Sequence, residues 1–165
     1  MRLLLIPFFL MFVTARAQVQ SSAYHLMLQT LLKHSVAEIS VEELKKKEGV
    51  VLLDARAAEE YAVSHLAKAV YVGYDDFDES RIKSLKKDTT IVVYCSVGYR
   101  SEKIAEKLMA AGYTNVANLY GGIFEWVNQG NEVVDATGKK TEAIHAYSKT
   151  WGLWLNKGKK VYAEP

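Results

Sequence analysis

The chain has 165 residues, half of them hydrophobic, which is enough for one domain with a substantial core. Its 21 Lys and Arg against 19 Asp and Glu leave a charge too close to neutral to favour a nucleic acid or an anionic membrane surface as partner. The single cysteine excludes an internal disulfide, so it is either a buried inert thiol or a reactive one.

The N-terminus has the pattern of a secretory signal peptide. Arg2 supplies a positive start, residues 3–13 are apolar, and Ala15-Arg16-Ala17 is a small-x-small cleavage pattern. A membrane anchor is the alternative, but this run of 11 residues falls short of the roughly 20 that span a bilayer. We therefore expect residues 1–17 to be removed. The product is an exported chain, periplasmic or extracellular, that begins at Gln18 and has no membrane span.

The first half of the remaining chain predicts short helices and strands. Apolar residues at helical spacing over 21–34 predict a lead-in helix within residues 18–37. Ser40 and Glu43 form a capping-box pattern for a short helix that ends near Lys47. The apolar run at 50–53 predicts a strand buried on both faces. Further predicted elements are a helix over 57–63, a strand over 69–72 and a loose helix over 77–85.

The second half contains the most pronounced strand and helix. Residues 90–94 predict a strand that ends at Cys95, and the helix that begins near Arg100 stops at Gly112. A strand over 116–120 leads to Gly121-Gly122, which opens another helix. Strands that alternate with helices predict an α/β fold, a parallel sheet with helices on both faces.

Residues 131–165 predict a C-terminal extension. A strand and turn at 133–138 precede a helical apolar spacing over 141–156 and a final strand at 160–162. The segment is too short to fold alone, so we expect it to pack on the main domain.

Cys95 is the candidate nucleophile. Ligands of open α/β sheets bind beyond the carboxyl ends of the strands, and the turn Cys95-Ser96-Val97-Gly98-Tyr99-Arg100-Ser101 lies there. A turn into a helix N-terminus directs backbone N–H groups inward and binds anions, which favours a thiolate. Gly98 permits a conformation that a side chain would forbid, and Arg100 offers a fork for a sulfonate-like or phosphate-like oxyanion.

The order of these motifs resembles the rhodanese-like sulfurtransferase family. The similar stretches are residues 51–56, Glu60-Tyr61, His65-Leu66, the Cys-x-x-Gly-x-Arg-Ser loop at 95–101, and residues 121–126. The resemblance runs from Glu38 to Gln129 and implies a rhodanese-like domain over 38–130. It also implies that Cys95 takes sulfane sulfur from a donor such as thiosulfate, forms a persulfide, and passes the sulfur to cyanide, a small thiol or a partner protein's cysteine. No metal or other cofactor is expected.

Two other functions remain open. The family resemblance implies a loop of six residues from Cys95 to Arg100, whereas the related cell-cycle phosphatases have seven. A phosphatase or arsenate reductase on this fold is one alternative, which a longer loop would favour. A noncatalytic binding module is the other, and loss of the cysteine would be its signature, whereas Cys95 is present. Ser96 stands where the family often has Arg, which removes one positive charge for an anionic donor. The turn at 64–69 keeps His65 but lacks the family's two glycines.

Asp54 and Arg56 lie at the carboxyl end of a neighbouring predicted strand. One hypothesis is that they orient the cysteine loop or Arg100. The favoured one is that they form a structural polar network between neighbouring loops.

Overall fold

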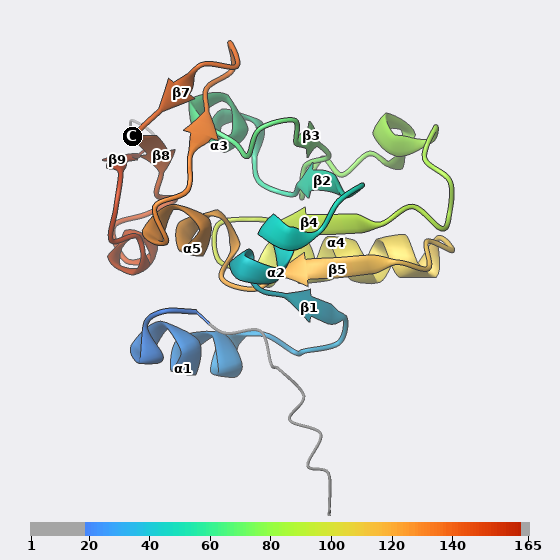
Figure 1. The fold of residues 1–165 in the computed structure, drawn as a ribbon, viewed down its shortest axis with the longest axis horizontal. Coiled ribbons are helices and arrows are strands. Elements are labelled where there is room, and N and C mark those ends of the chain that lie inside the picture. The colour runs from blue at the N-terminus through green and yellow to red at the C-terminus, as the bar shows by residue number, and fades with distance from the viewer. Residues whose placement is uncertain (1–18, 163–165) are drawn as a thin grey trace, which may run out of the picture.

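A five-stranded parallel sheet forms the centre of the computed structural model, which describes residues 19–162 (Figure 1). The strand order is β1-β5-β4-β2-β3, and every neighbouring pair is parallel. The strands are β1 (Ala37–Ile39), β2 (Val51–Asp54), β3 (Val70–Tyr71), β4 (Ile91–Tyr94) and β5 (Val116–Leu119). The predicted signal peptide lies outside the described residues.

Helices cover both faces of this sheet. The central strand β4 is completely buried, with Val92 and Tyr94 in one hydrophobic cluster and Ile91 and Val93 in the other, as expected when successive side chains point to opposite faces. Residues of α1 (Ser22–Leu31), α2 (Val41–Lys46) and α5 (Gly122–Asn128) belong to the first cluster. Residues of α4 (Tyr99–Ala110) and the 3-10 turn η1 (Glu79–Ile82) belong to the second. The predicted α/β class is confirmed.

Local signals produced several of these elements. At the start of α2, Glu43 N–H donates to Ser40 Oγ at 3.2 Å, and Ser40 N–H donates to Glu43 Oε2 at 2.8 Å, which confirms the capping box. Beyond α4, Gly112 has φ of +93°, the left-handed region where helices commonly end on glycine. The short helix α3 (Ala58–Val63) also forms where it was predicted.

The predicted helix over 141–156 is wrong. Strand β8 (Ala143–His145) pairs in parallel with β9 (Lys159–Val161), and the 3-10 turn η2 (Trp151–Trp154) follows β8. The apolar spacing was real, but its members do not share one face: Ile144 is buried, whereas Tyr147 is 52% exposed. Contacts with distant residues decided the conformation here, since short apolar runs suit either strand or helix.

Two smaller predictions also differ from the structure. Strand β1 was not predicted, because its residues Ala37, Glu38 and Ile39 show no extended apolar pattern. The loose helix over 77–85 is a single 3-10 turn, η1.

Residues 131–162 form the C-terminal extension, which packs on the body. Its hairpin of β6 (Val133–Val134) and β7 (Lys140–Thr141) is tied to the body by Val134, which exchanges two backbone hydrogen bonds with His65. The ring of Trp154 stacks on Tyr24 of α1, with centroids 5.4 Å apart. Figure 1 shows the extension at the end of the molecule to which β4 and β5 point. None of the helices within residues 19–162 is long and apolar enough to cross a membrane.

Candidate active site

Cys95 lies directly after the central strand, at the start of the turn into α4. Its side chain is 1% exposed, and its Sγ accepts the Gly98 N–H at 3.1 Å. Gly98, with φ of +122°, caps the 12-residue helix α4. The first N–H groups of a helix have no intrahelical acceptors, and the helix dipole favours negative charge at that end. The turn therefore provides an environment for an anionic sulfur.

The N-terminus of α5 holds the carbonyl side of this turn. Ile123 N–H donates to Cys95 O at 2.9 Å, and Phe124 N–H donates to Ser96 O at 3.1 Å. A Cβ on Gly122 would lie only 2.4 Å from Cys95 O, so only glycine permits this approach. The Gly121-Gly122 pair thus does more than open a helix: it lets the helix reach the cysteine loop.

A buried amide holds the other side of the turn. Asn118 of β5 donates from Nδ2 to Gly98 O at 3.0 Å, and Ser101 Oγ donates to Asn118 Oδ1 at 2.7 Å. Both side chains are fully buried. Sequence reasoning included Ser101 but missed Asn118. An asparagine inside an apolar strand was the available signal, because strands are poor in Asn.

Arg100 is engaged by a carboxylate. Its Nη1 and Nη2 donate to Glu60 Oε2 and Oε1 at 2.6 and 2.9 Å, a bidentate pair. This differs from the expectation that the guanidinium fork is open to a substrate oxyanion. Burial raises the pKa of Glu60, but the hydrogen bonds and charge of Arg100 outweigh burial, and the pKa is lowered.

Ser96 and the start of α3 complete this cluster. Ser96 Oγ donates to Glu60 Oε1 at 3.1 Å and accepts from Arg100 at 3.0 Å. Glu60 Oε2 also accepts the Ala57 N–H at 3.0 Å. Glu60 was noted only as a family motif and not as a site residue. Its partner is 40 residues away in the sequence, so local patterns could not identify it.

Asp54 and Arg56 form a separate, fully buried pair. Arg56 Nη2 donates to Asp54 Oδ2 at 2.7 Å and to Ser64 O at 2.6 Å. The guanidinium lies 5.8 Å from the centroid of the Tyr94 ring. These contacts join the end of β2 to the turn at Ser64, whereas the hydrogen bonds of Arg100 go to Glu60 and Ser96.

A cleft of about 640 Å³ opens beside Cys95. Besides Cys95, Ser96 and Arg100, its walls are formed by Leu31, Ala57, Glu59, Glu60, Tyr74, Asp75, Val97, Tyr99, His145, Tyr147 and Trp151. The last three come from the C-terminal extension and were not among the expected site residues. The sequence offered no local motif for them, because their place in the cleft depends on how the extension docks.

Within this wall, Tyr147 covers the arginine. Its ring centroid lies 5.2 Å from Arg100 Cζ, within cation–π range. Tyr147 N–H donates to His145 Nδ1 at 3.2 Å, and that nitrogen lies 3.9 Å from Glu60 Oε1. Burial lowers the pKa of His145, although the charge of Glu60 opposes the shift. The imidazole is therefore uncharged at neutral pH.

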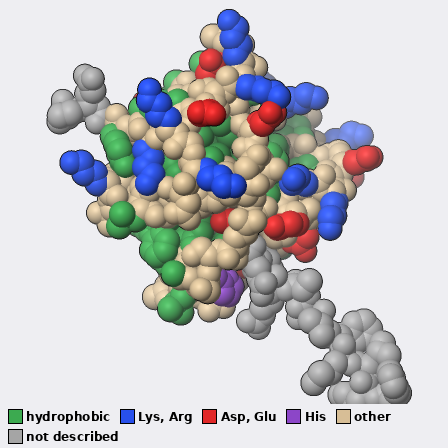
Figure 2. All heavy atoms as spheres, turned by 60° about the vertical axis from the view of Figure 1, so that its left-hand side comes forward, with side chains coloured by type: hydrophobic (Ala, Val, Ile, Leu, Met, Phe, Trp, Pro, Cys, Tyr) green, Lys and Arg blue, Asp and Glu red, His purple; other side chains and the backbone are tan. Residues whose placement is uncertain are grey.

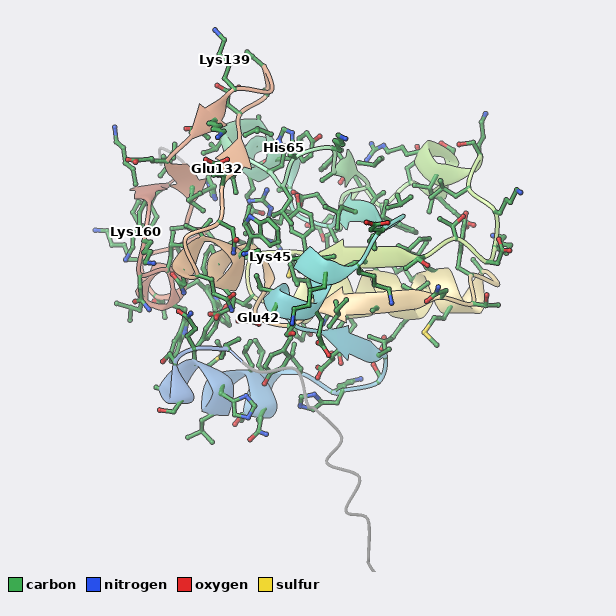
Figure 3. All side chains as sticks on the ribbon, viewed as in Figure 1. Glu42, Lys45, His65, Glu132, Lys139 and Lys160 are labelled. Carbon is green, nitrogen blue, oxygen red and sulfur yellow. The ribbon has the colours of Figure 1, made fainter. Side chains whose placement is uncertain are left out.

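The other histidine near a family motif, His65, has a different place. Its ring stacks on Tyr61 with centroids 3.9 Å apart, and its Nδ1 lies 3.0 Å from Tyr61 O. Figure 3 shows it beside the β6 end of the extension. Within residues 19–162 there is no cluster of three or more His, Cys, Asp or Glu side chains that could hold a metal ion.

Cys95 is buried in a turn between the carboxyl end of a central parallel strand and a helix N-terminus, the place where α/β domains bind their ligands. The comparison with known families narrows this class. Residues 39–129 match the family model described as Rhodanese-like domain, and the chain belongs to this family.

Several relatives are named as sulfurtransferases. A sulfurtransferase of Allochromatium vinosum is 34% identical over 107 residues, which are 62% of this chain and 99% of that protein. The thiosulfate sulfurtransferase GlpE of Coxiella burnetii is 28% identical over 96 residues, 58% of this chain and 89% of that protein. Such relatives support sulfur transfer as the activity at the level of the family.

Other matches concern larger proteins or the fold. In the adenylyltransferase and sulfurtransferase uba4 of Ogataea parapolymorpha, 30% identical over 91 residues, the match covers 55% of this chain but only 23% of that protein. The crystal structure of the BH2092 protein from Bacillus halodurans superposes with a TM-score of 0.55 at 27% identity, over 71% of this chain and 88% of that one.

Proposed function

We propose that this protein is a sulfurtransferase in which Cys95 carries sulfane sulfur as a persulfide. The observation that carries the proposal is the position of Cys95 Sγ, 3.1 Å from the Gly98 N–H at the N-terminus of α4 and beside a cleft of about 640 Å³. Backbone N–H groups at that end stabilise negative charge on sulfur whether the group is a thiolate or a persulfide.

The transfer takes two displacements at sulfur. The Cys95 thiolate attacks the outer sulfur of a donor such as thiosulfate. The donor's S–S bond breaks, its electron pair leaves with sulfite, and a new S–S bond joins the transferred sulfur to Cys95. An acceptor thiolate or cyanide then attacks that outer sulfur, and Cys95 leaves as thiolate. The sulfur atom moves without net oxidation, so no further reactant is required.

The engaged arginine disfavours a phosphatase or arsenate reductase. Phosphate recognition by such a loop needs a guanidinium free to bind the oxyanion bidentately, whereas both terminal nitrogens of Arg100 donate to Glu60. A noncatalytic module has no need for a thiol facing a cleft.

Intact mass measurement tests the proposal. The protein without residues 1–17 is incubated with an excess of thiosulfate or of an organic persulfide, and the expected result is a gain of one sulfur atom with either donor at high concentration. Cyanide should then remove that atom as thiocyanate. Because Cys95 is the only cysteine, Cys95→Ser must show no gain. Failure of both donors to add sulfur would overturn the proposal.

We also propose that the protein is exported. The basis is the sequence pattern of residues 1–17, with Ala15 and Ala17 at the small-residue positions. N-terminal sequencing of protein recovered outside the cytoplasm should find Gln18 first. Recovery of the uncleaved chain in the cytoplasm or a membrane would contradict this.

A further inference from the structure

The cleft beside Cys95 is acidic. Its walls hold three carboxylates, those of Glu59, Glu60 and Asp75, and one guanidinium, that of Arg100. Glu60 and Arg100 neutralise each other through their bidentate pair. The remaining charges, Glu59 and Asp75, are on exposed side chains, and the uncharged imidazole of His145 does not offset them. An approaching substrate therefore meets net negative charge.

The cleft is also aromatic, and half of this character comes from the extension. Tyr74 and Tyr99 belong to the body, and Tyr147 and Trp151 to the extension. Tyr147 has φ of +63°, a conformation that is unusual outside glycine, and in it the ring covers one side of the Arg100 guanidinium. With Glu60 holding its nitrogens, Arg100 presents little surface to an anion.

Figure 2 turns this end of the molecule forward and shows cationic side chains interspersed with acidic and hydrophobic ones. The cations are thus spread over this face, while the lining of the cleft itself has an excess of carboxylates.

From this lining we infer that the substrates are organic thiols and persulfides whose groups near the sulfur are uncharged or cationic, and that the cleft selects against dianionic donors such as thiosulfate. The inference rests on the proposed function and refines its donor. An organic persulfide reacts by the same displacement. The Cys95 thiolate takes the outer sulfur, the donor's S–S bond breaks, and the electron pair leaves on the donor thiolate.

The test compares donors of graded charge in the wild type and in the double variant Glu59→Gln, Asp75→Asn. The donors are thiosulfate, N-acetylcysteine persulfide, the persulfide of N-acetylcysteine amide, and cysteamine persulfide. The measured quantity is kcat/KM for sulfur loading of Cys95 at low ionic strength. Each donor is compared with itself in the two proteins, so differences in intrinsic reactivity cancel.

The double variant should raise kcat/KM for thiosulfate and N-acetylcysteine persulfide by about 3- to 10-fold, because two like charges no longer repel a dianion. It should leave the amide less affected and lower the value for cysteamine persulfide. The gain should shrink as salt is added. Glu42→Gln and Glu132→Gln, exposed positions away from the cleft lining (Figure 3), are the matched controls and should change no donor's value.

An equal change for all four donors, or no change for thiosulfate at low salt, would overturn the inference while leaving the proposed function intact. If no donor loads Cys95 in the wild type, the proposed function itself fails. The two failures are therefore distinguishable.

Discussion

The rhodanese-like body and the C-terminal extension build the same cleft in different ways. In the body, the cysteine loop is held by backbone hydrogen bonds from α5 and by the buried Asn118. The extension supplies side chains, His145, Tyr147 and Trp151, that line the cleft. The body therefore provides the thiol and the loop that holds it, and the extension supplies part of the cleft wall beside it.

The two regions also differ in what keeps them in place. The body's strands form one five-stranded sheet, whereas the extension has only two-stranded pairs. It is attached through particular contacts: Asn128 of α5 donates to Trp154 O at 2.9 Å and accepts the Asn156 N–H at 2.6 Å. The candidate nucleophile and the acidic side chains of the cleft, Glu59 and Asp75, thus lie on the body, whereas the docked extension covers Arg100 with Tyr147. The predictions below test that division, from the largest expected effect to the smallest.

Truncation after Gly130 should have the largest effect on stability. It removes the buried side chains of Val133, Ile144 and Leu155 from the core, each contributing about 1.5–3 kcal/mol. The free energy of unfolding in urea should fall by about 5 kcal/mol or more. A truncated chain as stable as the full chain would show that the extension is a loose appendage.

Gly122→Ala should disable the site from within the body. The added Cβ would meet Cys95 O at 2.4 Å, so the loop or α5 must move, at a cost of about 3 kcal/mol. Sulfur loading should fall by about 100-fold or more, measured as kcat/KM in the folded fraction. Gly138→Ala is the control in the extension, where φ is +79° but no atom lies within 4 Å. It should lose about 1 kcal/mol from backbone strain and no activity. Equal activity losses would contradict the division between the regions.

Glu60→Gln should change how the free energy of unfolding depends on pH in the acidic range. The lowered pKa of Glu60 means that its pairing with Arg100 stabilises the native state above the carboxyl's unfolded pKa of about 4.3 and is lost as pH falls through the folded value. The variant should be less stable than wild type by about 1–3 kcal/mol at pH 7, and the two should converge once the pH falls below the lowered pKa of Glu60. Urea unfolding across pH checks this. A constant difference at all pH values would show that the charge of Glu60 is not what stabilises the fold.

Tyr147→Asn should have the smallest effect, confined to selectivity. Asparagine tolerates the left-handed backbone, so the fold should remain within about 0.5 kcal/mol of the wild type. Uncovering Arg100 should raise kcat/KM for thiosulfate by about 2- to 5-fold relative to kcat/KM for the persulfide of N-acetylcysteine amide. Leu153→Asn, at a 71% exposed position of the extension outside the cleft lining, is the control. The same shift in both variants would mean that Tyr147 does not screen the arginine.

Much of the body could be predicted from the sequence because its signals are local. The apolar run ending at Cys95 formed β4, the capping box began α2, and Gly112 followed the end of α4. In each case neighbouring residues determine the conformation, through side-chain periodicity, capping or backbone freedom. Cys95 and its turn could be located for the same reason.

The tertiary structure alone decided what surrounds the thiol. Arg100 was expected to face substrate, but the fold brings Glu60 of α3 within hydrogen-bond distance of both terminal nitrogens of Arg100. The apolar spacing at 141–156 predicts a helix, but residues 143–145 form strand β8, which pairs with β9, and Ile144 packs in the core. The sequence around a charged or apolar residue does not show which distant residue it will contact. Ion pairs and docked segments therefore depend on contacts that form only when the chain has folded.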